Sequence, residues 1–268
     1  MDGAVHRRTL LRWSAAGATG LALAPRVLRA AALREGPREA PRDVGRKFEA
    51  DGRVRRFAGS TVICHLPQQG PDSASFDVLL DFYRAAPGHG FARRIALLPP
   101  SSYHMTVFGG VNDIGRNPKT WPAGIPIDAP IGDCNRIIGE RLRAAGLPRI
   151  ERLAMKVDAD DSGDDGNTLR IPLTPADAGE LARIEDLRAA IARTIGVPVP
   201  VSGTYQFHIT LAYTIAPFDE AERRDALAVM AEWKRRLVRR VPVIALGTPE
   251  YCTFEDMFAF KREFYVGS

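Results

Sequence analysis

Two short segments of the chain, residues 104–106 and 208–210, share the order histidine, apolar residue, threonine. An imidazole has an ordinary pKa of about 6.5, so one histidine of a pair can be neutral and accept a proton while the other is charged and donates one. A threonine hydroxyl can donate a hydrogen bond to a phosphate oxygen. His104, His208, Thr106 and Thr210 are therefore candidates for acid–base chemistry at a phosphate ester.

The residues around both segments alternate as they do in a half-buried β-strand. From Tyr205 to Tyr213 every second residue is apolar or aromatic, and side chains on a strand alternate between its two faces. This pattern predicts a core face that ends at Tyr213, with His208 and Thr210 on the opposite face. The segment 102–108 repeats the pattern around His104 and Thr106. We expect the two pairs to face each other across one cleft.

The elements that carry these strands follow from periodicity and from turn residues. Strands are predicted at 57–66, 95–98, 102–108, 150–157, 168–173, 204–214, 241–246, 250–254 and 257–266, and helices at 73–85, 133–145, 176–195 and 219–240. A glycine-, asparagine- and proline-rich loop is predicted at 109–132. Strands and helices are mixed and the second half echoes the first, which predicts an α+β fold of helices packed on antiparallel sheet.

The paired segments resemble the signature of the two-histidine (2H) phosphoesterase superfamily, which includes bacterial RNA 2′,3′-cyclic phosphodiesterases. The motif H-x-[T/S]-x is matched at residues 104–107 and 208–211, and the resemblance covers residues 57–268. It implies two pseudo-symmetric lobes of antiparallel sheet with packed helices around a central cleft. It also implies that His104 and His208 are an acid–base pair, without deciding which is the acid, and that Thr106 and Thr210 bind phosphate.

The function implied by the resemblance is hydrolysis of a cyclic or 2′-linked nucleotide or RNA-end phosphate. No cluster of histidines and acidic residues has the spacing of metal ligands, so we expect neither a metal nor another cofactor. A small phosphate ester is the expected partner, and no protein partner is evident. The alternative is a non-catalytic, exported protein that binds a phosphorylated ligand in the same cleft.

The first 32 residues combine positive charge, an apolar stretch and small residues, which are the three parts of an export signal. The arginine pair at positions 7 and 8 resembles the Tat signal, although His6 and Leu10 depart from its usual pattern. An uncut membrane anchor or a short amphipathic helix is the alternative. We predict a signal peptide at 1–32, a linker at 33–55 and a two-lobed domain at 56–268, with export to a bacterial periplasm and no membrane attachment after cleavage.

The net charge of +5 does not indicate a nucleic-acid-binding surface over the whole protein. Residues 1–32 carry five arginines and one acidic residue, so the rest of the chain has a net charge of only +1. The three cysteines, Cys64, Cys134 and Cys252, are too widely spaced for a zinc or redox motif. We expect them to be buried, while an oxidising compartment would also permit one disulfide.

Two further features each have two interpretations. His65 shares a predicted strand face with Thr61 and Ile63 and could reach the cleft, but a structural histidine is the favoured interpretation. The acidic stretch 158–167 has part of the pattern of a calcium-binding loop, yet Ser162 and Leu169 stand at two ligand positions. We therefore expect a solvated hairpin turn there.

Overall fold

Residues 40–268 are described by the computed structural model. The predicted signal peptide and the first part of the predicted linker lie outside these residues. The described part contains these strands: β1 Gly59–His65, β2 Ile95–Leu97, β3 His104–Asn112, β4 Leu153–Val157, β5 Thr168–Pro175, β6 Phe207–Thr214, β7 Ile244–Leu246, β8 Glu250–Phe254 and β9 Lys261–Tyr265. Its α-helices are α1 Ala74–Ala85, α2 Ile131–Ala144, α3 Ala178–Ile195 and α4 Glu220–Arg240, and three 3-10 turns span 86–88, 90–94 and 100–102.

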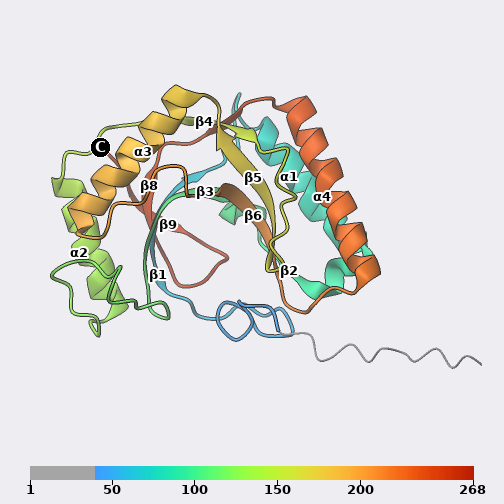
Figure 1. Ribbon diagram of the computed structural model, residues 1–268, viewed down its shortest axis with the longest axis horizontal. Coiled ribbons are helices and arrows are strands. Elements are labelled where there is room, and N and C mark those ends of the chain that lie inside the picture. The colour runs from blue at the N-terminus through green and yellow to red at the C-terminus, as the bar shows by residue number, and fades with distance from the viewer. Residues whose placement is uncertain (1–39) are drawn as a thin grey trace, which may run out of the picture. The chain divides into compact units, whose positions relative to one another are not determined.

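The strands form one antiparallel sheet in the order β7-β4-β5-β6-β3-β1-β8-β9, with the short β2 paired to β6. The sheet curls strongly, and the helices lie outside the curl, α1 beside α4 and α2 beside α3 (Figure 1). The α+β class and the antiparallel sheet are confirmed. The sheet runs without a break through the β3–β6 pair, and the pseudo-symmetric lobes around a cleft stay a prediction.

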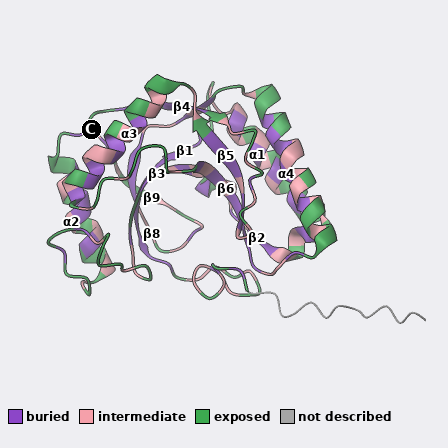
Figure 2. Ribbon diagram, viewed as in Figure 1, coloured by how far each residue is buried: buried purple, intermediate pink, exposed green. Residues whose placement is uncertain are grey.

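Local sequence signals account for the ends of the helices. The Asp219 side chain accepts from the backbone N–H of Glu222, whose own side chain accepts from the backbone N–H of Asp219, and this capping box starts α4. The Asp177 side chain accepts from the backbone N–H of Glu180 at the start of α3, and Gly196 ends that helix in the left-handed conformation that suits glycine. Each helix turns a buried side toward the sheet and an exposed side outward (Figure 2), as amphipathic patterns require.

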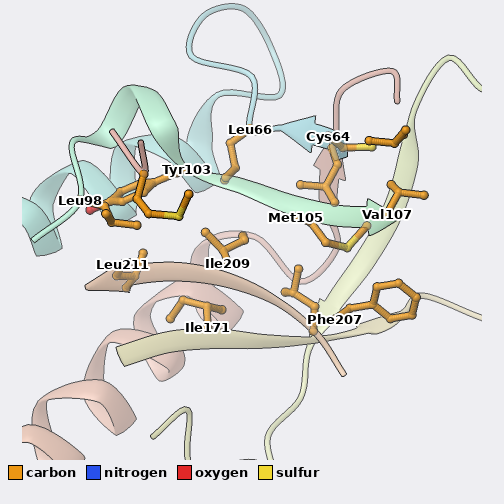
Figure 3. Packing of buried hydrophobic residues seen from close by; sticks show 14 of the residues in the cluster. Cys64, Leu66, Leu98, Tyr103, Met105, Val107, Ile171, Phe207, Ile209 and Leu211 are labelled. Carbon is orange, nitrogen blue, oxygen red and sulfur yellow. The ribbon is translucent and has the colours of Figure 1, made fainter. Parts of the chain in front are cut away.

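The core lies between the helices and the outer face of the sheet. Met105 of β3, Ile209 of β6 and Ile171 of β5 are all 0% exposed and lie together in this layer (Figure 3). The helices reach the same face, because Tyr251 of β8 donates a hydrogen bond to the carbonyl of Asn135 in α2. We call the opposite side, turned away from the helices, the inner face.

A bulge follows each histidine-threonine segment. Because of the bulge in β6, the predicted position of Tyr213 on the core face is wrong. Thr210 pairs with Arg170 and Ala212 with Leu169, so Leu211 is an extra residue in β6. The alternation of faces shifts at such a residue, and Tyr213 consequently lies on the inner face instead of the predicted core face. There its ring packs 5.1 Å from that of Phe48. Val107 is the matching extra residue in β3, between the pairs of Thr106 and Phe108 with β1.

Part of the predicted linker is packed on the domain. We call residues 41–55 the strap. Phe48 in the strap is 0% exposed, and Lys47 donates a hydrogen bond to the hydroxyl of Tyr213 at 3.2 Å. Asp43 is 2% exposed and faces Lys47 at 3.4 Å. The arginine- and proline-rich composition suggested a linker, but the single phenylalanine anchors the segment, so ordered structure begins before the predicted boundary at residue 56.

Two other expectations can be compared with the structure. The cysteines Cys64, Cys134 and Cys252 are buried and free. The acidic stretch is the tip of the β4–β5 hairpin, and its carboxylates accept hydrogen bonds from backbone N–H groups of the same turn. Among residues 40–268, no helix is long and apolar enough to cross a membrane.

Candidate functional site

The two histidine-threonine segments meet where β3 pairs with β6. Met105 and Ile209 are register partners in this antiparallel pair, and both point into the core. The residues that flank each of them therefore point to the inner face. His104, Thr106, His208 and Thr210 are all half-buried there. Antiparallel geometry places His104 opposite Thr210 and Thr106 opposite His208, with diagonal neighbours about 7–8 Å apart. The structure thus brings the four predicted side chains together on one face.

Both histidine rings are held by the same contact. Nδ1 of His104 lies 2.6 Å from the carbonyl oxygen of Ser102, and Nδ1 of His208 lies 2.8 Å from the carbonyl oxygen of Gln206. A carbonyl oxygen only accepts, so Nδ1 carries the hydrogen in each ring. Each neutral ring then keeps the lone pair on Nε2, which is the arrangement of a proton acceptor. The carbonyl two residues earlier in the chain fixes the tautomer in both segments.

Burial keeps both imidazoles neutral, but to different degrees. Burial lowers the pKa of His104 to about 3, against a smaller opposite effect from the Ser102 carbonyl, and the charges of His65 and His208 lower it further. Burial also lowers the pKa of His208, and the Gln206 carbonyl again opposes this shift. Of the two shifts, the one at His104 is the larger.

Groups from the β4–β5 hairpin surround His208. Arg170 is the register partner of Thr210 and forms ion pairs with Asp161 at 3.4 Å and with Asp165 at 3.3 Å. Arg170 lowers the pKa of His208, whereas Asp165 and Asp161 raise it. Positive and negative side chains therefore both lie close enough to His208 to shift its pKa. The sequence did not single out Arg170, because nothing in its local pattern marks its pairing with β6.

Thr106 already has a polar neighbour. Its side chain hydrogen-bonds to the hydroxyl of Tyr205, a residue whose pKa burial raises. The guanidinium of Arg188 in α3 lies 4.2 Å from the Tyr205 ring centre and donates to the carbonyl oxygen of Val107. Tyr205 was expected on the core face of a strand beginning at Thr204. Since β6 begins at Phe207, Tyr205 is free to turn toward the first segment.

His104 also has neighbours that the sequence did not assign to the site. His65 is its register partner in the β1–β3 pair, and the two ring centres are 6.0 Å apart. The ring of Phe260, from the β8–β9 connection, lies 4.3 Å from the His104 ring at an angle of 62°. His65 therefore does reach the inner face beside the candidate pair. Its partner Glu250, at 2.5 Å, is 185 residues away and could not be found from spacing.

Two cavities are lined by neighbours of the histidines, although neither lining includes the four candidate side chains. One of about 610 Å³ is lined by Tyr205, Gln206, Pro172 and Asp161, among others, next to His208. The other, of about 770 Å³, is lined by His65 and Phe260, next to His104. Within residues 40–268, no group of three or more His, Cys, Asp or Glu side chains is placed to hold a metal ion.

Comparison with known proteins gives one family match and several similar solved structures. Residues 47–162 match the family described as "2H-phosphodiest: Domain of unknown function (DUF1868)". The matched range contains His65, His104 and Thr106 and stops before His208. No curated protein matches the chain.

Among solved structures, the conserved protein of unknown function ATU0111 from Agrobacterium tumefaciens str. C58 is similar to this chain with a TM-score of 0.74. It is 28% identical, and the match covers 86% of this chain and 94% of that protein. The protein TT0787 of Thermus thermophilus is 16% identical with a TM-score of 0.37, over 80% of this chain and 99% of that one. The family match points to a phosphodiesterase-type function, and none of these names gives a substrate.

Proposed function

We propose that the protein is a metal-independent phosphodiesterase that hydrolyses a cyclic or 2′-linked nucleotide or RNA-end phosphate. The observation that carries the proposal is the inner-face arrangement of His104 and His208, each anchored through Nδ1 with Nε2 left for chemistry. The match of residues 47–162 to a 2H-phosphodiesterase family supports the same reaction class. The shared anchor and the shared bulge also support two pseudo-symmetric halves, one for each segment.

The environments of the two rings favour His104 as the base and His208 as the acid. His104, with a pKa of about 3, stays neutral and can take a proton through Nε2 from the attacking water. Burial lowers the pKa of His208 as well, but Asp165 and Asp161 oppose this shift, and no acidic neighbour within residues 40–268 does so for His104. An anionic phosphate bound between the rings raises both pKa values, because the opposite charge favours imidazolium.

In one hydrolytic turnover, the oxygen of water bonds to phosphorus while its proton passes to Nε2 of His104. The bond from phosphorus to the leaving ribose oxygen breaks, and that oxygen receives the Nε2 proton of His208. The hydroxyls of Thr106 and Thr210 donate to phosphate oxygens whose negative charge grows in the transition state. With a 2′,3′-cyclic phosphate and the 3′ oxygen as leaving group, the product is a 2′-phosphate.

The test is turnover of a panel of 2′,3′-cyclic nucleotides by the purified protein in EDTA. We expect hydrolysis by the wild type and a loss of about 10²- to 10⁴-fold in kcat for His104→Ala and for His208→Ala. His89→Ala is the matched control, since His89 stacks on Phe91 at 5.3 Å, beside Asp225 of α4. Binding of a nucleotide without turnover would contradict the proposed enzymatic function and favour the alternative of a non-catalytic binding protein.

We also propose that the protein is exported, through the Tat-like segment at residues 1–32. Arg7 and Arg8 followed by an apolar stretch support this proposal. N-terminal sequencing of the protein from its native source should give a start near residue 33. An intact Met1 or Asp2 would contradict cleavage.

A further inference from the structure

His65 stands beside the proposed histidine pair on a neighbouring strand. It ends β1 as the register partner of His104, so both side chains point to the inner face. The ring centres are 6.0 Å apart in an edge-on arrangement, and the His65 side chain is 23% exposed. A third imidazole therefore lies within reach of a group bound at the pair.

A buried carboxylate fixes the orientation of this ring. Glu250 starts β8 opposite Ile63 of β1, and its Oε1 lies 2.5 Å from Nδ1 of His65. Its other oxygen, Oε2, lies 3.5 Å from a guanidinium nitrogen of Arg262. Glu250 is only 4% exposed, and a carboxylate is buried at a high free-energy cost unless charged or hydrogen-bonding partners compensate it.

The contact with Glu250 leaves the second ring nitrogen of His65 for another partner. The carboxylate accepts from Nδ1–H, as the backbone carbonyls do for His104 and His208. Within residues 40–268, the hydrogen bond to Glu250 is the one bond recorded for the His65 ring. Nδ1 thus makes the anchoring contact at all three histidines.

The space in front of His65 is open to a ligand. His65, Glu250 and Phe260 all line the cavity of about 770 Å³, and Phe260 also touches the ring of His104. Phe260 therefore belongs both to the lining of the cavity and to the surroundings of His104. His65 therefore lines this cavity while its Nδ1 is held by Glu250.

We propose that His65 is a third histidine of the site, whose Nε2–H donates a hydrogen bond to an oxygen of the phosphate held by His104 and His208, and that Glu250 is its positioning residue. This inference rests on the proposed function and names a further ligand of the same phosphate. A ring that donates Nδ1–H to Glu250 and Nε2–H to the phosphate carries a hydrogen on both nitrogens. A charged His65 in turn helps to keep His104 neutral.

The experiment compares His65→Gln, Glu250→Gln and the double variant with wild type and with the control His89→Gln. Binding of inorganic phosphate is measured by calorimetry, and kcat and KM are measured on the best cyclic nucleotide. Loss of one hydrogen bond to a charged group should weaken phosphate binding about 10- to 100-fold in His65→Gln. Glu250→Gln should weaken it less, and should add nothing in the His65→Gln background because Glu250 acts through His65.

The readouts separate the two proposals. If cyclic nucleotides are not turned over but phosphate binding falls in His65→Gln, the proposed phosphodiesterase function is wrong. The proposal that His65 binds phosphate is then still supported. If turnover occurs and His65→Gln changes neither phosphate affinity nor kcat/KM, the proposed role of His65 is wrong. The proposed phosphodiesterase function is then still supported. Thermal unfolding is measured for each variant. If Glu250→Gln does not fold, His65→Gln decides the matter alone, since His65 is partly exposed at the end of its strand.

Discussion

Met105 and Ile209 face each other across the β3–β6 pair, and this contact in the core sets which side chains reach the inner face. Both are 0% exposed. A slip of one residue in either strand would turn its histidine and threonine into the core. The packing of two apolar side chains thus maintains the relation between two polar segments that are about a hundred residues apart in sequence.

This contact gives a prediction about stability. Ile209→Ala leaves a cavity between tightly packed neighbours and should lower the free energy of unfolding by about 2–5 kcal/mol, whereas Ile209→Val should cost about 0.5–1.5 kcal/mol. Urea denaturation measures both. Val201→Ala is the control, because Val201 is 72% exposed and should change stability by less than about 0.5 kcal/mol. Equal stability of wild type and Ile209→Ala would show that β3 and β6 do not pack as described.

The two threonine hydroxyls should matter for catalysis more than for folding. Thr106→Val and Thr210→Val keep the shape and remove the donor, so we expect kcat to fall on the order of 10²-fold in each. Serine variants should retain most of the activity because they keep the hydroxyl. Tyr205→Phe should leave kcat within a few-fold of wild type. It removes only the hydroxyl that Thr106 contacts in the free protein, and the Thr106 hydroxyl remains to bind phosphate. Full activity in both valine variants would remove the threonines from the mechanism.

Much of this site follows from the sequence, because strand alternation is a local property. Strand alternation with a period of two, together with apolar neighbours, is enough to predict the inner-face positions of His104, Thr106, His208 and Thr210. Tyr213 was placed on the wrong face because the extra residue Leu211 shifts the alternation. A bulge depends on how two strands pair, and the sequence of β6 contains no residue that predicts it.

The other additions to the site depend on distant partners. Glu250 and His65 are far apart in the chain, and only the β1–β8 pairing brings them within hydrogen-bonding distance. The strap was taken for a linker on composition, since its charged residues outnumber the one buried ring, Phe48. Its contact with Tyr213 could not be foreseen while Tyr213 was assigned to the core face. One unrecognised bulge therefore accounts for two differences.

The lowered pKa of His104 links stability to pH. An exposed histidine in the unfolded chain has a pKa of about 6.5, and in the folded protein burial lowers that of His104 to about 3. Between these values the unfolded state binds the extra proton, so the stability contributed by neutral His104 is present above a pH of about 6.5 and is lost as the pH falls toward about 3. In His104→Gln this dependence is absent.

The measurement is the free energy of unfolding in urea, for wild type and His104→Gln, at intervals from about pH 7 to about pH 4, within the window set by the two pKa values. The stability of the wild type relative to the variant should decrease steadily as the pH falls. Other carboxylates and histidines titrate in both proteins and cancel in the difference. Parallel curves would mean that His104 is not buried enough to resist protonation.

The strap should contribute to stability without taking part in the reaction. Phe48→Ala removes a fully buried ring that packs on Tyr213 at 5.1 Å and on Phe258 at 6.0 Å. Deletion of such a ring costs about 3–5 kcal/mol, so we expect a clear fall in the urea midpoint. Catalysis below the unfolding transition should stay unchanged, because neither contact involves the histidine pair. If Phe48→Ala instead lowers kcat while stability is kept, the strap acts on the site through Tyr213, which shares β6 with His208.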